Sequence, residues 1–83
     1  LYQNYPNPFN PNTRIKYDIK EAGDVTLVVH NILGQKVAEL VNDYKEAGSY
    51  TITFSAETLP SGLYIYTLEA GGTKISKKMT LLK

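Results

Sequence analysis

The sequence predicts an all-β domain, an antiparallel sandwich of about six to seven strands. Two observations carry this prediction. Apolar and polar residues alternate with a period of two along most of the chain, and turn sequences interrupt the alternation about every 8 to 12 residues. The chain has 83 residues and no cysteine, so one small core must hold it together without disulfides. Because it begins at Leu1 and not at Met, we expect it to be a piece of a longer protein.

The first twelve residues are rich in proline and asparagine, with three prolines falling within six residues. A proline fixes its own φ and favours extended geometry in the residue before it, so we predict a stiff, extended segment over 1–12. Tyr5 and Phe9 lie inside it, and we expect both rings to pack on the open end of a sandwich formed by 13–83, each contributing about 1.5 to 3 kcal/mol. The whole of 1–83 is therefore interpreted as one domain.

Four runs of clean alternation predict strands over 14–19, 24–30, 49–55 and 62–70. The apolar residues of one parity in each run are expected to share one face of the strand: Ile15, Tyr17, Ile19, Val25, Leu27, Val29, Tyr50, Ile52, Phe54, Tyr64, Tyr66 and Leu68. The last run is also apolar on its other face, through Leu63 and Ile65. A strand of this kind usually lies in the middle of a sheet with both faces covered, so we predict a central position for 62–70.

The segment 73–83 predicts a final strand. Ile75, Met79 and Leu81 are expected to face inward, and Lys77 breaks the alternation, which we interpret as a bulge. The outward side chains of this strand are mostly polar. Its edge is therefore suited to recognition by a partner protein through strand addition.

The segment 35–44 fits two patterns. Its apolar residues lie at i, i+3, i+4 and i+7, the stripe of an amphipathic helix: Val37, Leu40, Val41 and Tyr44. The same residues also fit a short strand followed by a loop. Gly34 just before the segment and the strand-rich surroundings favour a strand, paired with 25–30.

Glycine-containing turns separate the runs. The near-identical sequences KEAGD and KEAGS each precede a strand, and we expect Gly23 and Gly48 to supply positive φ there. The sequences NILG at 31–34 and AGG at 70–72 predict hairpin connections.

The composition offers little for catalysis. There is one histidine, no cysteine and no tryptophan, and the eight carboxylates are scattered among separate turns and edges. No nucleophile elbow, phosphate-binding glycine loop or histidine near a candidate serine is present, so we predict no enzyme activity, no catalytic residue and no cofactor. His30 is interpreted as a surface strand residue and not a metal ligand, and the acidic side chains of 18–24 as solvated turn residues and not calcium ligands.

The charge balance argues against two classes of partner. The formal net charge is +1, which creates no field to attract nucleic acid. No run of about 18 apolar residues occurs, so we predict no transmembrane segment. The only local bias is a set of lysines after Glu69, for which we expect a weak contact with lipopolysaccharide or another polysaccharide: Lys74, Lys77, Lys78 and Lys83.

Four stretches together resemble a known family: LYQNYPNPFNPNTRIKY at the start, VHNILGQKVAELV in the middle, LPSGLYIYTLEAGG, and the final KKMTLLK. In order and spacing they are similar, over essentially 1–83, to the type A C-terminal sorting domain of the type IX secretion system (Por secretion system) of Bacteroidetes and related phyla. The middle part also resembles the Ig-like domain of flagellar hook-capping proteins. The resemblance therefore implies an Ig-like antiparallel β-sandwich. His30 stands where family domains often carry an aromatic residue.

The resemblance implies that the domain is a non-catalytic sorting signal. Such domains direct the cargo domain on their N-terminal side through the type IX translocon at the outer membrane, and a sorting peptidase then often removes them as the cargo is attached to surface lipopolysaccharide or released. The expected location is the periplasm in transit, then the outer membrane, the cell surface or the medium. Recognition by the translocon is implied, by resemblance, for Pro6, Asn7, Pro8, Phe9, Gly62, Tyr64, Lys77, Lys78, Met79, Leu81, Leu82 and Lys83.

Two other functions are compatible with the sequence, an accessory carbohydrate-binding module of a secreted glycoside hydrolase and a structural Ig-like spacer. The tyrosines available for a sugar-binding platform are Tyr2, Tyr5, Tyr44 and Tyr66. LPSGLY also resembles the tyrosine corner of Ig-like sandwiches, in which a tyrosine hydroxyl bonds the backbone just upstream. That interpretation gives Gly62 and Tyr64 a structural role, whatever the translocon recognises.

Overall fold

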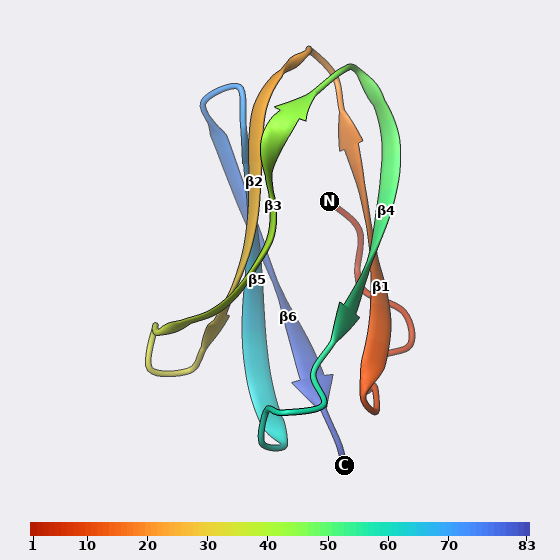
Figure 1. The fold of residues 1–83 in the computed structure, drawn as a ribbon, viewed down its shortest axis with the longest axis vertical. Helices are drawn as coiled ribbons and strands as arrows, with labels where there is room; N and C mark the ends of the chain where they lie inside the picture. The colour runs from red at the N-terminus through yellow and green to blue at the C-terminus, as the bar shows by residue number, and fades with distance from the viewer.

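The computed structural model describes all 83 residues as six strands joined by turns and loops. The strands are β1 (Asn12–Ile19), β2 (Gly23–Asn31), β3 (Lys36–Lys45), β4 (Gly48–Ser55), β5 (Gly62–Ala70) and β6 (Thr73–Leu81). They form two antiparallel sheets, one of β1 and β4 and the other in the order β3–β2–β5–β6. The two sheets face each other as the layers of a sandwich (Figure 1), which confirms the predicted fold class.

The strand order is that of an immunoglobulin sandwich. In that fold strands B and E are neighbours in one sheet, strands C, F and G follow one another in the second, and C′ lies beside C in the larger version. Here β1 and β4 take the places of B and E. The strands β3, β2, β5 and β6 take the places of C′, C, F and G, so the Ig-like arrangement is present in the topology.

Side chains from both sheets form one core between the layers. In β1, β2 and β5 the apolar residues expected to share one face are all buried, including Tyr66, which the sequence left available for a sugar platform. In β4, Phe54 is buried, whereas Tyr50 and Ile52 are half-buried and pack against the core. The Tyr50 ring stacks on the ring of Tyr17 across the β1–β4 pair, with centroids 5.4 Å apart. Removal of these alternating apolar side chains from water is the main driving force for the fold.

β5 lies between β2 and β6, so its predicted central position is confirmed. Its outer face is not covered, because Leu63 is exposed and Ile65 is only half-buried. An antiparallel sheet can have one face against the core and the other in water, and no third layer lies outside this sheet. The expectation that both faces of β5 are covered is wrong.

The ambiguous segment 35–44 forms a strand, β3, which pairs with β2 as predicted. Its register against β2 shifts at two places, where Val37 and Leu40 are extra residues without a direct partner. Each bulge adds one residue between positions that face the same way. The inward residues Ala38 and Val41 therefore lie three apart and not two, which gives a strand the spacing of a helix.

The N-terminal segment, residues 1–12, first runs along β1. Tyr2 N–H donates to the carbonyl of Lys16 at 3.0 Å. Tyr5 exchanges two backbone hydrogen bonds with Arg14, also at 3.0 Å. Directly opposed residues of an antiparallel pair point to the same face, and Arg14 faces solvent, so the Tyr5 ring points outward and is 74% exposed. The expectation that Tyr5 packs on the core is wrong.

The same segment then crosses to β6 of the other sheet. Phe9 lies parallel beside Leu81 in an isolated bridge. Its N–H donates to the carbonyl of Thr80, and its carbonyl accepts from Leu82 N–H, at 3.0 Å in both cases. The Phe9 ring enters the core, where it is 2% exposed and lies 6.1 Å from the ring of Phe54 between centroids. The expected packing of Phe9 is confirmed.

β6 pairs with β5 in one unbroken register, so the bulge expected at Lys77 is absent. Lys77 occupies an inward position and is half-buried. Met79 and Leu81 are buried as predicted, but Ile75 is 40% exposed. The N-terminal segment reaches only the second half of β6, and the inward residues of the first half therefore stay open to solvent.

Two hairpin predictions are confirmed. Gly71 and Gly72 join β5 to β6 with φ of +57° and +77°, as a two-residue type I′ turn requires. The NILG turn joins β2 to β3, with Gly34 at a φ of +82°. Gly48 has the expected positive φ, but Gly23 does not, although each glycine is the first residue of its strand.

Truncation of the buried ring in the N-terminal segment should destabilise the domain. Phe9→Ala is expected to lower the free energy of unfolding by about 3 to 5 kcal/mol, because it leaves a cavity between the sheets. Tyr5→Ala is the matched control in the same segment, and its effect should stay within about 0.5 kcal/mol. Denaturant titration followed by circular dichroism measures both. Equal, small effects would show that the segment is not part of the folded module.

Candidate functional site

Three stretches that lie far apart in the sequence meet at one end of the sandwich. They are the PNPF sequence of the N-terminal segment, the start of β5 after the LPSG loop, and the end of β6. Gly62 of β5 is opposite Leu81 of β6, and Leu81 lies beside Phe9. Figure 1 shows the C-terminus leaving the fold at this end, close to the loop that precedes β5. Three of the four stretches that carry the family resemblance thus form one continuous region.

Hydrogen bonds fix the end of the chain to this region. Lys83 N–H donates to Ser61 Oγ at 3.0 Å, and Lys83 Nζ donates to the carbonyl of Glu57 at 2.6 Å. On the other side of β6, Asn7 Oδ1 accepts from Thr80 N–H at 3.0 Å. The final LLK sequence therefore has a defined position between the loop and the N-terminal segment.

The structure divides the residues for which recognition is implied into two groups. Four are buried and belong to the core: Phe9, Tyr64, Met79 and Leu81. The others are exposed, except for the half-buried Lys77: Pro6, Asn7, Pro8, Gly62, Lys78, Leu82 and Lys83. A partner protein can contact only the second group without unfolding the domain. We use the name tail site for the exposed surface made by Asn7, Pro8, Ser61, Gly62, Leu82 and Lys83.

The G-x-Y sequence at 62–64 has a structural role of its own. Tyr64 Oη donates to the carbonyl of Pro60 at 2.6 Å, which confirms the predicted tyrosine corner. β4 contains a second bond of the same kind. There, Tyr50 Oη donates to the carbonyl of Glu46, also at 2.6 Å and also four residues upstream.

The two tyrosine bonds share their backbone geometry. Each tyrosine follows a glycine two residues earlier, and these glycines have nearly the same φ, +153° at Gly48 and +155° at Gly62. Side chains other than glycine rarely adopt such a φ, although neither glycine has an atom within 4 Å of an added Cβ. Backbone conformation, and not lack of space, therefore requires glycine. The repeat of this geometry in β4, outside the tail site, means that the fold is sufficient reason for Gly62 and Tyr64.

A buried polar cluster, which sequence reasoning missed, holds the N-terminal segment in place. Asn4 Nδ2 donates to Thr13 Oγ1 at 3.0 Å and to the carbonyl of Pro6 at 3.1 Å. Thr13 Oγ1 donates to the same carbonyl at 2.9 Å. The Tyr66 hydroxyl, from the opposite sheet, accepts from Asn4 N–H and donates to the carbonyl of Tyr2, both at 2.8 Å. Burial raises the pKa of Tyr66, which keeps the hydroxyl neutral and able to make both bonds.

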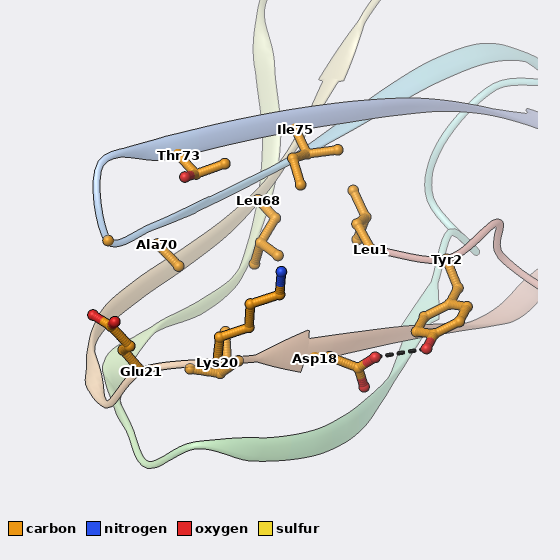
Figure 2. A pocket seen from close by; sticks show the side chains of 11 residues that line it. Leu1, Tyr2, Asp18, Lys20, Glu21, Leu68, Ala70, Thr73 and Ile75 are labelled. Carbon is orange, nitrogen blue, oxygen red and sulfur yellow. Dashed lines mark hydrogen bonds between the residues drawn. The ribbon is translucent and has the colours of Figure 1, made fainter.

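Asp18 near the end of β1 accepts two side-chain hydrogen bonds. It accepts from Tyr2 Oη at 2.6 Å (Figure 2) and from Ser49 Oγ at 2.7 Å. These two bonds lower the pKa of the Asp18 carboxyl, since they stabilise its charged form, and the bond from Tyr2 has the larger effect. The same bond raises the pKa of Tyr2, whose ring also has Lys16 Nζ 5.0 Å from its centroid.

The structure forms neither a metal cluster nor an aromatic platform. No group of three or more His, Cys, Asp or Glu side chains is placed to hold a metal ion. His30 is half-buried at the end of β2, beside the turn to β3. Of the tyrosines available for a sugar platform, Tyr66 is buried in the core, Tyr44 belongs to β3, and Tyr2 and Tyr5 belong to the N-terminal segment. A row of three exposed rings is therefore not formed.

The chain matches one known protein family along nearly its whole length. Residues 3–81 match the family model described as "Secretion system C-terminal sorting domain". The chain belongs to the type IX secretion system C-terminal sorting domains. No curated protein and no solved structure matches it.

Membership of this family fixes the coarse role of the sorting domain. It is a signal in type IX secretion and interacts with that secretion system, and its presence implies a secreted or cell-surface protein. Sorting domains are in general non-catalytic. The structure of this sorting domain contains no helix of the length and hydropathy needed to cross a membrane.

Removal of the Tyr64 hydroxyl should destabilise the sorting domain without touching the tail site. Tyr64→Phe keeps the buried ring but loses the bond to Pro60, so the free energy of unfolding should fall by about 0.5 to 1.5 kcal/mol. Denaturant titration measures this change, with Tyr50→Phe as the companion variant for the bond in β4. An unchanged unfolding midpoint for Tyr64→Phe would remove the stabilising role of the corner bond.

Acidification should weaken the contact at Asp18. The pKa of Asp18 is lower in the folded chain than in the unfolded one, so the folded state binds fewer protons. Stability should therefore fall as the pH drops below about 4 and through the folded-state pKa. Asp18→Asn removes the contribution of this carboxylate to the pH dependence. The melting temperature of the variant should therefore fall less than that of the wild type between about pH 6 and about pH 2. Thermal melts test this, with Glu21→Gln as control, and identical pH profiles for Asp18→Asn and the wild type would contradict it.

Proposed function

We propose that this sorting domain directs a cargo protein on its N-terminal side through the type IX translocon at the outer membrane. The cargo passes from the periplasm to the surface, where a sorting peptidase separates it from the domain and it is attached or released. The single observation that carries the proposal is the convergence of three of the four family motifs at the tail site. The role of the domain is recognition, with no chemistry of its own.

The tail site has properties that suit recognition by a protein. Leu82 is 56% exposed, although a leucine side chain is usually more stable when buried. Its backbone N–H is bonded to Phe9, and Lys83 beside it is bonded to Ser61 and Glu57. Both terminal side chains are therefore presented from an ordered backbone. A partner that contacts them pays little entropy for ordering the site.

The burial pattern decides how the proposal can be tested. Deletion of 77–83 would remove Met79 and Leu81 from the core, so a loss of export after that deletion would report unfolding as well as lost recognition. Substitution of exposed side chains separates the two effects. Leu82 and Lys83 are the residues to change, because both are exposed and their backbone bonds survive side-chain truncation.

Loss of the tail-site side chains should abolish export of a folded cargo. Residues 1–83 are fused behind a signal peptide and a fluorescent reporter, in a host that has the type IX system. The fusion should reach the surface or the medium, whereas the double variant Leu82→Ala with Lys83→Ala should stay in the periplasm. Fractionation of cells and medium measures the distribution of the reporter, and a thermal melt of the isolated variant shows that it is folded.

The β2–β3 turn provides a matched control. Leu33→Ala with Lys36→Ala also removes one exposed leucine and one exposed lysine, and this variant should be exported normally. Export of the tail-site variant at the wild-type level would show that the tail site is not the recognised surface. If the unaltered fusion itself stays in the periplasm, the proposed sorting function is wrong.

A further inference from the structure

The outer edge of β6 is only half covered. In its second half, Phe9 bonds the backbone of Thr80 and Leu82. Gln3 Nε2 donates to the carbonyl of Lys78 at 2.7 Å. No part of the N-terminal segment forms a backbone bond with the first half of the strand, next to the β5–β6 turn.

The first half of the edge presents unpaired backbone groups. Ala70 and Thr73 flank the two-residue turn and are bonded to each other, so alternate residues from Thr73 onward bond to β5. Lys74 and Ser76 therefore direct their N–H and C=O groups away from the sheet, where these groups have no partner. Such a row of groups is a template to which an extended peptide adds as a further strand.

A pocket of about 500 Å³ lies beside this free edge, between the end of β1 and the β5–β6 hairpin. Leu1, Leu68 and Ile75 face into it, and Lys20 extends from the end of β1 toward Leu68 (Figure 2). Ile75 points to the core side of β6 and is still 40% exposed, whereas Met79 further along the strand is buried. An added strand would place its inward side chains over this apolar floor.

Charge selects the kind of peptide. Lys74 and Lys77 lie along the free half, and Lys78 follows where the covered half begins. The one ion pair among these lysines joins Lys74 to the exposed Glu69 at 3.5 Å. If two copies of the domain paired antiparallel through this edge with Ser76 at the centre, Lys74 of each copy would lie opposite Lys78 of the other, and like charges in direct opposition destabilise a strand pair. An acidic peptide would instead form favourable electrostatic interactions with the same lysine side chains.

We propose that the free half of the β6 edge, together with the pocket beside it, binds an extended acidic peptide of a partner protein by strand addition. The peptide alternates, because successive side chains of a strand point to opposite faces. One apolar side chain enters the pocket beside Ile75, on the side of Ile75 that faces away from Leu68. The acidic side chains on either side of it lie on the outer face, next to Lys74 and Lys78. The binding does not depend on the export role of the tail site.

The test uses fluorescein-labelled peptides and the 83-residue chain. The probe is the peptide EVEIEVE, and the control is EEVVIEE, which has the same composition without the alternation. Fluorescence anisotropy should give a dissociation constant about tenfold lower for the alternating peptide, and added salt should raise it. Equal affinity for the two peptides would overturn the proposal, because charge alone would then account for binding.

Backbone and charge variants test the geometry. Ser76→Pro removes an N–H that points away from β5, a position where an edge strand tolerates proline, and should weaken binding of EVEIEVE about tenfold. Ser76→Ala controls for the lost hydroxyl bond to Thr67 and should bind normally. Thr53→Pro, on the free edge of β4, should also bind normally. Thermal melts establish that each variant is folded.

A charge reversal provides an independent gain of function. The double variant Lys74→Glu with Lys78→Glu should no longer bind EVEIEVE, and it should bind KVKIKVK about tenfold more tightly than the wild type does. Failure of this exchange, or unchanged binding by folded Ser76→Pro, would overturn the proposal. The remaining alternative is that a second copy of the domain occupies the edge, and analytical ultracentrifugation of the chain without peptide tests it. A dimer that Ser76→Pro dissociates would assign the edge to a second copy.

Discussion

The N-terminal segment is the only stretch of backbone that hydrogen-bonds to both sheets. Elsewhere the two layers meet through side chains alone, and such contacts do not fix how one sheet lies along the other. Tyr5 pairs with β1 and Phe9 pairs with β6, and the hydroxyl of Tyr66 holds the backbone just before Tyr5, at Tyr2 and Asn4. This double attachment places the PNPF motif beside the end of β6. It also determines which half of the β6 edge is covered and which half stays open.

The sequence predicted most strands correctly because burial on one face imposes a simple alternation. It was less informative wherever the backbone departs from that alternation. In β3, two bulges change the spacing of the inward residues, and the result imitates a helix. Tyr5 and Phe9 look equivalent in an extended proline-rich segment. Their opposite fates depend on pairing with Arg14 and Leu81, which lie in different sheets and cannot be inferred from neighbouring residues.

The candidate site was predictable as a set of motifs but not as a surface. Nothing in the spacing of Phe9, Gly62 and Leu81 indicates that they lie together, because strand order brings them into contact. The separation of core residues from exposed ones also required the structure. Two local signals were present in the sequence and went unused. One is the second G-x-Y at 48–50, which has the geometry of the first. The other is Asn4, an amide side chain able to bond the backbone two residues on.

The attachment of Phe9 to β6 also sets the order in which this fold can close. The partner of the earliest aromatic anchor is the last strand of the domain, so contacts between the two ends of the sequence must form before the core is sealed. Contacts of such long sequence separation make folding slow, and they cannot form on a ribosome that has not yet released the final strand. A nascent or prematurely ended chain that stops before Met79 lacks the surface against which Phe9 is buried. Closure of the sandwich thus requires that the whole of this domain, through β6, has been synthesised.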